Sequence, residues 1–592
     1  MFFSGDDVMN MTYAWNLDPV RLFGAVPLFW TPVYRPLGSG IYRIFYAVFG
    51  FHPEPLYVFS WLLLSLNVFL GCRLFRVLSG SLWTALAALS ITLVHGTFQD
   101  LYLSAGTIFD RLCFLFTALG LALYAEWRGD GRPLSRRQSV WIAVICLLAL
   151  DSKESGVVLI ALLGCYELVF VIPDSVRNGG AGHRLRGILP LFAGLGALAL
   201  AFVFLRVNRT PELMMTPAYQ AKASLTLWLT RLAEYFGMLA YRGAPVGTPA
   251  VGIPGVITIL TLTAAAAGAL RNRAMIFGLL FFLLAVTPVA LIASRPGYVL
   301  YVPELGLGLY LASLAFELAR RFRIPDSRDG LVFAAVACSA LWFHAAHWPP
   351  PFDPRILPEL RLAEELRRDY PSMPEHSRLL YVSDDFPPLA FDLAFTVRLF
   401  YNDKSLVVHR LAGPRDQTPE PGRPLQYDHV FALTGGSYEE LDNRDVREAV
   451  RLHILRRFTV GREMDFSHRD YPAYLVSGIE DGENPEPSRW TKPKAVLKFD
   501  LYPAPAVFTA KFWVPDFVAR PERSLEVLVN GAPAGVVPLN KVGMNEIRLP
   551  VEAAAVSRTG FTLVQMNVPQ PYRDAAGIEY GVVLLRAGFE YR

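Results

Sequence analysis

The sequence predicts a polytopic α-helical membrane protein followed by an extracytoplasmic C-terminal α/β module and a β-sandwich. Hydrophobic residues make up 53% and charged residues 18% of the 592 residues, whereas an average soluble protein has about 25% charged residues. Up to about residue 348, apolar runs of roughly 15 to 21 residues follow one another, close to the length that a helix needs to cross ~30 Å of hydrocarbon. No run of this kind follows residue 348.

The apolar runs predict about ten membrane-spanning helices. They cover residues 57–72, 82–95, 109–127, 139–150, 156–173, 187–206, 250–270, 275–293, 299–319 and 330–347. Arginines fall in alternate connections between these runs, starting with Arg73 and Arg76 and ending with Arg320, Arg321 and Arg323. Because short cytoplasmic loops are enriched in Lys and Arg, we place these connections inside. We therefore expect a multi-pass protein of the cell (inner) membrane.

The remaining connections are expected to lie outside, in the periplasm. They are the N-terminal segment to about residue 56, residues 96–108, 207–249 and 295–298, and the whole of 348–592. An external N-terminus needs a segment that exports it, and no such signal precedes Met1. Since Phe2 and Phe3 are typical of the last turn of an apolar helix, we expect a further apolar segment upstream of Met1.

Cysteine usage and net charge argue against three classes of protein. All five cysteines lie in or at the ends of the predicted spans, so a disulfide framework in the external region and a metal site of the CxxC type are excluded. The net charge of +4 does not indicate nucleic-acid binding. We therefore expect the predicted spans to be surrounded by membrane lipid.

The external region divides into two predicted domains. In residues 349–485, strand-like and helix-like patterns alternate, which is typical of a small α/β module. These patterns cover 379–383, 389–401, 405–410, 429–434 and 444–458. Residues 486–592 contain short alternating runs, and Asn530-Gly531 predicts a two-residue hairpin between two of them. Short strands at this spacing predict a β-sandwich.

Two groups of residues in the external region leave alternatives open. Trp490, Trp513, Tyr572 and Tyr580 either stack on a sugar ring or fill the sandwich core, which is the more frequent position of such residues. Ser383-Asp384-Asp385 follows a predicted strand, as the metal-binding acidic loops of nucleotide-sugar transferases do, but nucleotide sugars are scarce outside the cytoplasm. A divalent cation stays open as a cofactor, and no metal ligands are assigned.

The first candidate site is the acidic pair Asp6-Asp7 in the N-terminal segment. One interpretation is that the pair caps an external helix starting near Val8, since Asp is a preferred N-cap residue. The other is catalytic: adjacent carboxylates repel each other and separate their pKa values, so one can act as general base while the other orients a substrate or cation.

A second candidate site follows the fourth predicted span, where Lys153 and Glu154 lie next to hydrocarbon. Charges in this position are costly unless they are paired or functional. Their simplest functional use is that Lys153 binds a phosphate while Glu154 fixes the lysine.

Two further groups lie at the same predicted face. Asp110 and Arg111 either contribute to a site or form an ion pair at a helix end, and His95 is either functional or an ordinary interfacial histidine. Arg295 is either functional or a topological anchor. Tyr298 and Tyr301, which follow Arg295, are either functional or part of an aromatic belt. A channel or proton-coupled carrier would place charges near the middle of the bilayer, and this sequence does not.

The order of these motifs resembles the membrane glycosyltransferases of the GT-C fold. The motifs are the acidic pair, Tyr34-Arg35-Pro36-Leu37, the segment from His95 to Asp110-Arg111, Ser152-Lys153-Glu154-Ser155, and Arg295 through Tyr298 to Tyr301-Val302-Pro303. The chain is most similar to the protein O-mannosyltransferase-like group and to the transmembrane and tetratricopeptide-repeat mannosyltransferases, without the repeats. The resemblance covers residues 1–348, with residues 1–56 as the catalytic external loop.

This resemblance implies an inverting transfer of a mannose-like sugar from a polyprenyl-phosphate donor to a protein or glycan acceptor outside the cytoplasm. Asp6 or Asp7 would be the general base, and Arg35, Lys153 and Arg295 would hold the lipid phosphate, whose departure needs its charge stabilised. His95, Asp110, Arg111, Glu154, Tyr298 and Tyr301 would complete the substrate site. The alternative is a non-catalytic carrier of lipid-linked sugar or a glycan-binding membrane scaffold, which has no need for the acidic pair.

Overall fold

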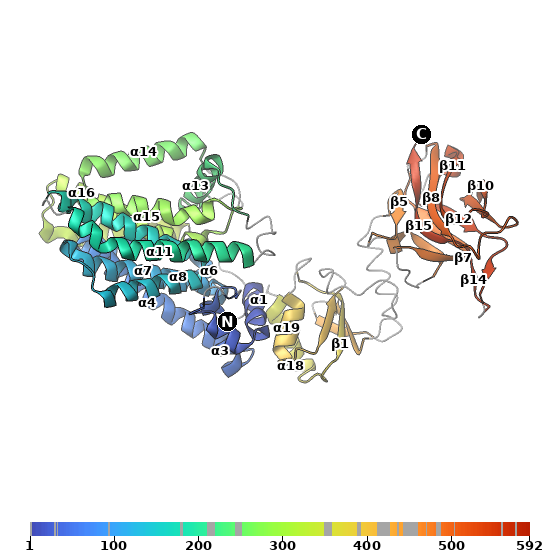
Figure 1. The fold of residues 1–592 in the computed structure, drawn as a ribbon, viewed down its shortest axis with the longest axis horizontal. Coiled ribbons are helices and arrows are strands. Elements are labelled where there is room, and N and C mark those ends of the chain that lie inside the picture. Colours follow the sequence, from blue (N-terminus) through green and yellow to red (C-terminus); the bar gives the residue numbers. More distant parts are fainter. Residues whose placement is uncertain are drawn as a thin grey trace. The chain divides into compact units, whose positions relative to one another are not determined.

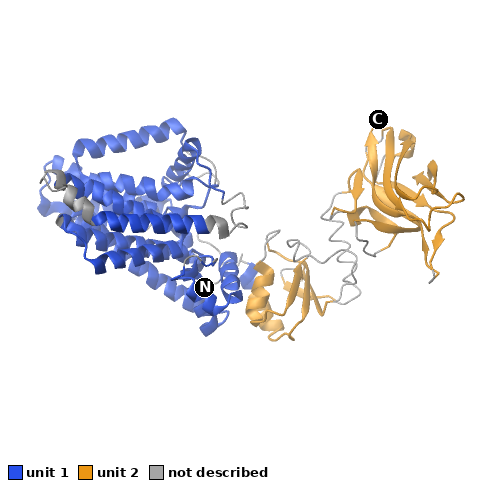
Figure 2. Cartoon of the chain, in the orientation of Figure 1, with its two compact units in different colours: residues 1–361 blue, residues 362–592 orange. Residues whose placement is uncertain are grey.

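The protein folds into two compact units, residues 1–361 and 362–592, which are described separately (Figures 1 and 2). The computed structural model describes residues 3–28, 31, 33–92, 95–177, 181–209, 220–242, 251–347, 358–386, 392–410, 427–434, 437–441, 460–468, 471–480, 487–501, 504–557, 561–574 and 577–591.

Unit 1 is a bundle of long apolar helices. Within the described residues, seven helical stretches are long and apolar enough to cross a membrane: Glu54–Ser79, Ala105–Arg128, Glu154–Asp174, Ile188–Leu205, Ile253–Leu270, Arg273–Ala290 and Asp326–Ala346. Each coincides with one predicted span. The polytopic helical fold and the β-rich C-terminal region predicted from the sequence are therefore confirmed.

The other three predicted spans are also helices, but they do not reach this length and hydropathy. They are α5 (Leu82–Thr92), α8 (Arg136–Ser152) and α16 (Pro303–Arg321). The 11 residues of α5 rise only ~16 Å, about half of the hydrocarbon thickness. Helix α16 has an acidic residue, Glu304, in its first turn and two arginines in its last. The predicted number of about ten spans therefore stays a prediction for these three helices.

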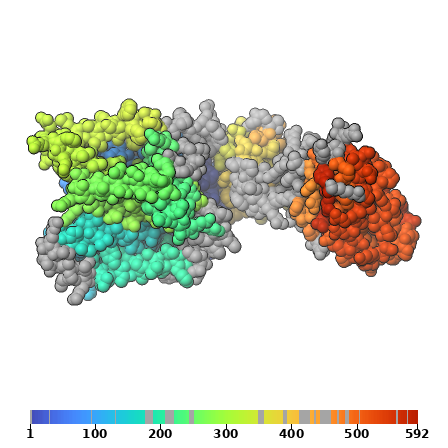
Figure 3. Space-filling model, turned by 90° about the horizontal axis from the view of Figure 1, so that it is seen from above, coloured from blue at the N-terminus to red at the C-terminus, as the bar shows by residue number. Residues whose placement is uncertain are grey.

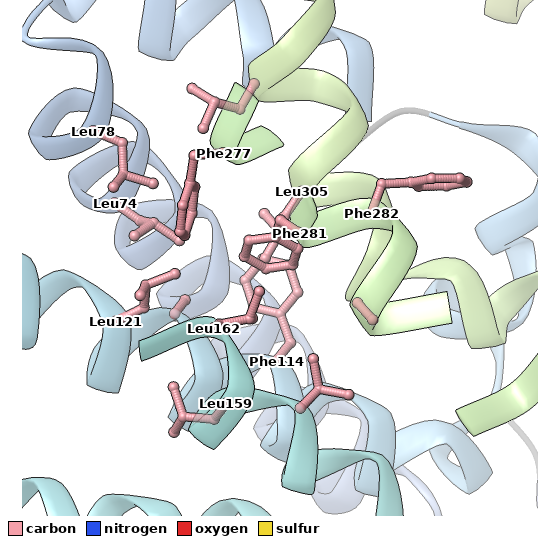
Figure 4. Packing of buried hydrophobic residues seen from close by; sticks show 14 of the residues in the cluster. Leu74, Leu78, Phe114, Leu121, Leu159, Leu162, Phe277, Phe281, Phe282 and Leu305 are labelled. Atoms are coloured by element: carbon pink, nitrogen blue, oxygen red, sulfur yellow. The ribbon is translucent and has the colours of Figure 1, made fainter. Parts of the chain in front are cut away.

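The core of unit 1 lies where five of its helices meet: α4 (Glu54–Ser79), α7 (Ile108–Arg128), α9 (Val158–Tyr166), α15 (Arg273–Ala290) and α16. Figure 4 shows Phe281 of α15 beside Phe114 of α7 and Leu162 of α9 in this core. A Cβ atom at Gly278 would lie 2.6 Å from the carbonyl oxygen of Gly306. The backbones of α15 and α16 therefore touch, as is common between membrane helices with small residues at the contact.

Two helices of unit 1 show little burial. Helices α14 (Ile253–Leu270) and α17 (Asp329–Ala346) each belong to a candidate span of which only 11% is buried inside the protein. The chain from α13 to α17, coloured green to yellow-green, forms much of the face of unit 1 seen in Figure 3. Exposed apolar helices of this kind are expected where a protein faces lipid.

The N-terminal segment, predicted as an external loop, contains three helices: α1 (Gly5–Asn16), α2 (Pro19–Gly24) and α3 (Pro36–Phe49). Helix α1 is amphipathic and packs on α3 with Val8, Met11 and Trp15 buried. A further helix, α13 (Leu225–Leu239), lies in the stretch 207–249 that was predicted only as external. These helices form one end of the bundle around the candidate site.

The first part of unit 2 is the predicted α/β module. Its strands are β1 (Arg378–Ser383), β2 (Val407–Arg410), β3 (His429–Thr434) and β4 (Ser437–Glu440), in the order β2-β1-β3-β4. Strands β2 and β3 both run parallel to β1, and β4 is antiparallel to β3. Helices α18 (Pro358–Asp369) and α19 (Asp392–Tyr401) bury Leu362, Leu366, Leu393 and Val397 in the same core as the sheet. The predicted helix 444–458 lies outside the described residues.

The second part of unit 2 is a β-sandwich. Its main strands are β7 (Arg489–Phe499), β8 (Ala506–Val514), β9 (Ser524–Val529), β10 (Ala532–Pro538), β11 (Gly543–Val551), β12 (Thr562–Asn567) and β15 (Val583–Tyr591), in the order β10-β9-β12-β7-β15-β8-β11. One core takes alternate residues from these strands, among them Leu497, Phe512 and Val527. The first and last strands of this order approach each other, because a Cβ atom at Gly535 of β10 would lie 2.7 Å from the side chain of Leu549 of β11.

The sandwich begins before residue 486, where the predicted boundary lay. Strands β5 (Glu463–Asp465) and β6 (Leu475–Ile479) pair with β15 and β7. They were not recognised in the sequence because each is short. The predicted hairpin is present: Asn530 and Gly531 have φ angles of 48° and 84°, the left-handed conformations that a two-residue turn between strands requires.

Candidate active site

Arg35 is held in an unusual backbone conformation at the start of α3. Its φ of 44° is in the left-handed region, which is uncommon for a residue other than glycine, and the next residue, Pro36, restricts its backbone further. The guanidinium lies 4.5 Å from the ring centre of Tyr34 and 5.1 Å from that of Phe109. Its Nε and Nη2 atoms donate to Glu154 Oε2 at 3.1 and 2.7 Å. Strained residues of this kind cluster at functional sites.

Lys153 forms a second ion pair beside the first. Its Nζ atom donates to Asp110 Oδ1 at 2.5 Å and lies 5.7 Å from the ring centre of Tyr298. Asp110 also attracts the Arg35 guanidinium. Because Lys153 and Glu154 follow each other at the end of α8, the helix presents one partner to each ion pair.

Asp6 and Arg295 are near enough to Tyr298 for their charges to act on it. Tyr298 interacts electrostatically with Asp110, Asp6, Arg35 and Arg295. Asp6 lies on the exposed side of α1, and its Cβ atom is 3.0 Å from where a Cβ at Gly106 would stand. A glycine at 106 therefore lets α1 lie against the 3₁₀ turn Ala105–Thr107.

We define the charged cluster as Asp6, Arg35, Asp110, Lys153, Glu154, Arg295 and Tyr298. These residues are far apart in sequence and are brought together at one end of the helical unit. The cluster contains three acidic and three basic side chains, so its formal charge is zero. Arg35 and Lys153 are already paired with carboxylates, and an anionic ligand has to compete with Glu154 and Asp110 for them.

Asp7 differs from its neighbour Asp6 because it is completely buried. Its Oδ2 atom accepts from Ser4 N at 2.9 Å and Ser4 Oγ at 2.7 Å, which completes a capping box, and its Oδ1 atom accepts from the Tyr42 hydroxyl at 2.7 Å. Burial raises the pKa of Asp7 to about 6. The N-cap of α1 is therefore Ser4 rather than an Asp of the pair, the helix starts at Gly5 rather than near Val8, and Asp7 supports the cap from the third helical position. Asp6 is left as the exposed carboxylate of the pair.

Arg111 lies in the interior of the bundle. It is buried and donates through Nη2 to the carbonyl oxygens of Leu101 and Ser104, at 2.5 and 2.7 Å. The side chain therefore holds the turn 99–107 in place. Asp110 and Arg111 do not use each other as the ion pair considered from the sequence, since Asp110 pairs with Lys153.

His95 and Tyr301 also make their contacts inside the bundle. Thr97 N donates to His95 Nδ1 at 3.2 Å, so the other ring nitrogen, Nε2, donates to the carbonyl oxygen of Leu239 at 2.9 Å. The ring of Tyr301 stacks on Phe114 with 4.3 Å between centroids. His95 and Tyr301 were predicted at the same membrane face as the residues of the charged cluster, but they contact residues of the bundle interior instead.

Several residues that position the cluster were not recognised in the sequence. Tyr42 binds Asp7 as described. On α13, Arg231 pairs with the buried Glu234 at 2.5 Å, and Glu234 accepts from Ser294 at 2.7 Å. This contact fixes the loop that carries Arg295. The i, i+3 spacing of Arg231 and Glu234 within an apolar stretch was an available signal for this helix.

The described residues contain no group of three His, Cys, Asp or Glu side chains that would hold a metal ion. In the acidic loop after β1, Asp384 forms a fully buried ion pair with Arg410, and Asp385 accepts from Tyr438 at 3.1 Å. Both carboxylates are therefore used within the α/β module.

The aromatic residues of the sandwich have mixed positions. Trp490 packs partly against the core, and its ring centroid lies 5.2 Å from that of Tyr580. The ring centroids of Tyr572 and Phe517 are 4.6 Å apart. Trp513 is 44% exposed and points away from the core. Sugar binding by this surface stays a prediction.

No protein-family model matches the sequence, and no curated protein matches it. Solved structures that match include the arabinosyltransferase EmbB from Mycobacterium smegmatis, at 14% sequence identity and a TM-score of 0.25. The match covers 100% of this chain and 65% of the EmbB chain, so this chain spans less than two thirds of the length of EmbB. A TM-score of this size does not establish a common fold, and the function is therefore argued from the residues of the site.

Proposed function

We propose that this protein is an integral membrane glycosyltransferase that moves a sugar from a polyprenyl-phosphate donor to a hydroxyl acceptor at the external face of the membrane. The carrying observation is the charged cluster, which joins an exposed carboxylate, Asp6, to cations suited to a phosphate, Arg35 and Lys153, at the end of an apolar helical bundle. Charges at the edge of hydrocarbon are costly and usually functional.

In the proposed reaction, the acceptor oxygen attacks the anomeric carbon of the sugar from the side opposite the phosphate. The bond between that carbon and the phosphate oxygen breaks, and polyprenyl phosphate leaves with the electron pair. Asp6 takes the acceptor proton, because it is the exposed member of the acidic pair. Attack from the opposite side inverts the anomeric configuration.

Arg35 and Lys153 have the chemistry to stabilise the departing phosphate. Arg35 presents a planar guanidinium that can bind two phosphate oxygens, and Lys153 adds a point charge. The packing of Arg35 against Tyr34 and Phe109 fixes the guanidinium before a ligand arrives. Arg295 adds a third cation near Tyr298. Positioned charges of this kind act where negative charge develops in the transition state.

The membrane helices support a lipid-borne donor, since such a substrate is confined to the bilayer. A mannose-like sugar, a protein or glycan acceptor and a periplasmic position for unit 2 belong to this proposal. The reaction as written needs no metal ion.

The variant Asp6→Asn tests the proposal in purified full-length protein with polyprenyl-phosphate mannose as donor. Loss of a general base lowers the rate by ~10² to 10⁴, so we expect transfer to fall by that factor while donor binding stays unchanged. The matched control is Asp18→Asn, because Asp18 caps α2 by accepting from Arg21 N and Asn caps a helix equally well.

Normal transfer by Asp6→Asn would contradict the role of Asp6. A wild-type protein that binds the lipid donor but transfers no sugar, from this or related polyprenyl-phosphate sugars, would instead support the carrier alternative.

A further inference from the structure

A short connection between α5 and α7, residues 96–107, contacts two parts of the candidate site. Three short helices follow one another in it: η1 (Gly96–Phe98), α6 (Gln99–Leu103) and η2 (Ala105–Thr107). Helix η2 packs against α1, which carries Asp6. Helices η1 and α6 pack against η7 (Gly297–Leu300), which contains Tyr298 and follows Arg295. The 96–107 segment therefore contacts both the helix of the proposed base and the loop of a proposed phosphate ligand.

The contact between the segment and α1 is close because residue 106 is a glycine. A Cβ atom at Gly106 would lie 3.0 Å from the Cβ atom of Asp6, so an alanine there would displace its neighbour by a few tenths of an ångström. Beside this contact, the hydroxyl oxygens of Ser104 and Ser4 are 3.2 Å apart and hydrogen-bond the segment to the N-cap of α1. The position of Asp6 therefore depends on the backbone of the segment.

The contact between the segment and η7 is closer still. A Cβ atom at Gly297 would lie 2.7 Å from the Cβ atom of Thr97, a distance that side chains essentially never reach. An added methyl group would therefore displace one of the two backbones. The buried ring of Phe98 packs edge-on against Tyr301, with 5.6 Å between the ring centroids. The position of Tyr298, which follows Gly297, therefore depends on the same segment.

The 96–107 segment is itself fixed by the long helices of the bundle. Four successive carbonyl oxygens in it accept hydrogen bonds from side chains of α4 and α7: Leu101 and Ser104 from Arg111, Tyr102 from Trp61, and Leu103 from Tyr57. The last carbonyl groups of a helix have no partner within it, so these bonds also satisfy the C-terminal end of α6. A segment that is held in this way can transmit a fixed position to both of its neighbours.

We propose that the 96–107 segment is a spacer that sets the distance between Asp6 and the loop with Arg295 and Tyr298, and that Gly106 and Gly297 are its positioning residues. The inference rests on the proposed function, because it takes Asp6 as the base and Arg295 as a phosphate ligand. Inverting transfer places the acceptor oxygen, the anomeric carbon and the phosphate oxygen in line. The base and the phosphate-binding cations must therefore be held at a matching separation.

The experiment changes each contact separately in the full-length protein. Gly106→Ala changes the contact with Asp6, and Gly297→Ala changes the contact with η7. Both are made in the wild type and in Asp6→Asn, and kcat and KM are measured with radiolabelled polyprenyl-phosphate mannose. The control is Gly164→Ala on α9, where the nearest atom to an added Cβ belongs to Phe192 and lies at 3.9 Å. Thermal unfolding shows which variants are folded.

We expect Gly106→Ala to lower kcat with an unchanged KM for the donor. A misplacement of ~1 Å can lower a rate by ~10², so a smaller shift of Asp6 should lower it by about tenfold. In Asp6→Asn the same change should cost less than about twofold, because the base that it displaces is already absent. Gly297→Ala should lower kcat/KM by a similar factor in both backgrounds, since it acts on the phosphate side.

An equal fall for Gly106→Ala in both backgrounds would overturn the inference, because a merely structural change lowers transfer whether or not Asp6 is present. Normal transfer by folded Gly106→Ala would overturn it as well. If Gly106→Ala does not fold, Tyr57→Phe takes its place, since it keeps the ring and removes only the bond to Leu103. The same dependence on Asp6 is then expected, with a smaller fall.

The failure of the proposed function gives a different result. Normal transfer by Asp6→Asn alone would reject Asp6 as the base, and the spacer would then have no base to position. A large fall in Asp6→Asn, together with no effect of either glycine variant, would keep the proposed function and reject the spacer.

Discussion

The two ends of the helical bundle both contain ion pairs, but their construction is different. At one end, Arg128 and Glu167 have side chains that are only 1% and 4% exposed. At the end with the charged cluster, Arg35 and Glu154 are 15% and 37% exposed. About 27 Å of α7 separates the two ends, since Asp110 and Arg128 lie in its first and last turns.

Every polar atom of the buried pair has a partner. Arg128 binds both oxygens of Glu167, at 2.7 and 2.8 Å, and also donates to the carbonyl oxygen of Arg132, while Tyr124 donates to Glu167 at 2.7 Å. A pair of this kind has no access for a ligand. In the charged cluster, the side chains of Lys153 and Asp110 are 12% and 10% exposed, so Glu154 is the most accessible carboxylate, and in our proposal a phosphate replaces it as the partner of Arg35. In our proposal, this difference separates a structural ion pair from one that binds substrate.

The largest effect is expected for the buried pair. Removal of one partner of a buried ion pair leaves an uncompensated charge and costs about 3 to 5 kcal/mol. The variant Arg128→Ala should lose stability of this size in thermal unfolding of the detergent-solubilised protein. The control Arg73→Ala breaks the half-exposed pair with Glu126 at the same end and should cost at most ~1 kcal/mol. Equal losses in the two variants would contradict the distinction between the pairs.

The second largest effect is expected in the charged cluster, as a fall in the rate of sugar transfer. Lys153→Gln combined with Asp110→Asn removes both charges together and retains groups that hydrogen-bond, so no carboxylate is left unpaired. Loss of a positioned phosphate-binding group typically lowers the rate by ~10² to 10³. We expect sugar transfer to fall by about this factor while the unfolding temperature stays near that of the wild type. A folded double variant with full activity would remove Lys153 from the site.

The acidic pair gives a third prediction, on pH. Burial raises the pKa of Asp7 to about 6, above the 3.8 of an unperturbed Asp. A raised pKa in the folded state stabilises the fold below pH ~4, and this contribution is lost as the pH rises through ~6. Asp7→Asn has no such titration. The unfolding temperature of the variant relative to the wild type should therefore rise between pH 4 and pH 7.

The unfolding temperature of Asp7→Asn is compared with that of the wild type at each pH, because other carboxylates titrate in the same pH range in both proteins. A difference that does not change with pH would show that Asp7 titrates normally. The variant Asp6→Asn serves as the control in the same helix.

Much of the fold could be predicted because apolar runs and turn signals are local. Seven predicted spans and the Asn530-Gly531 hairpin match the structure. Placing Asp6, Arg35, Lys153 and Arg295 at one side of the membrane stays a prediction, of which the structure shows the contacts of Arg35 with Glu154 and of Lys153 with Asp110. The sequence did not separate Asp6 from Asp7, because their difference depends on the capping box with Ser4 and the contact with Tyr42, 35 residues away.

Arg111 is a second residue whose position could not be predicted from the sequence. It follows Asp110 directly, yet successive helical residues point about 100° apart, so Asp110 meets Lys153 while Arg111 enters the core. Which of the two faces the site depends on the rotation of α7 about its axis. That rotation is set by packing against α4 and α8, and no local pattern in the sequence records it.

The smallest effect is expected for Glu154→Gln. Glu154 is the more exposed partner of Arg35, and a partly exposed ion pair contributes only about 0.2 to 1 kcal/mol. If a lipid phosphate takes the place of this carboxylate, removal of its charge should tighten the binding of undecaprenyl phosphate by about two- to fivefold. The stability of the variant should change little, because Arg35 stays packed between Tyr34 and Phe109. Weaker binding would show that Glu154 positions Arg35 for the phosphate rather than competing with it, and the ion pair would then resemble the buried pair at the other end of α7.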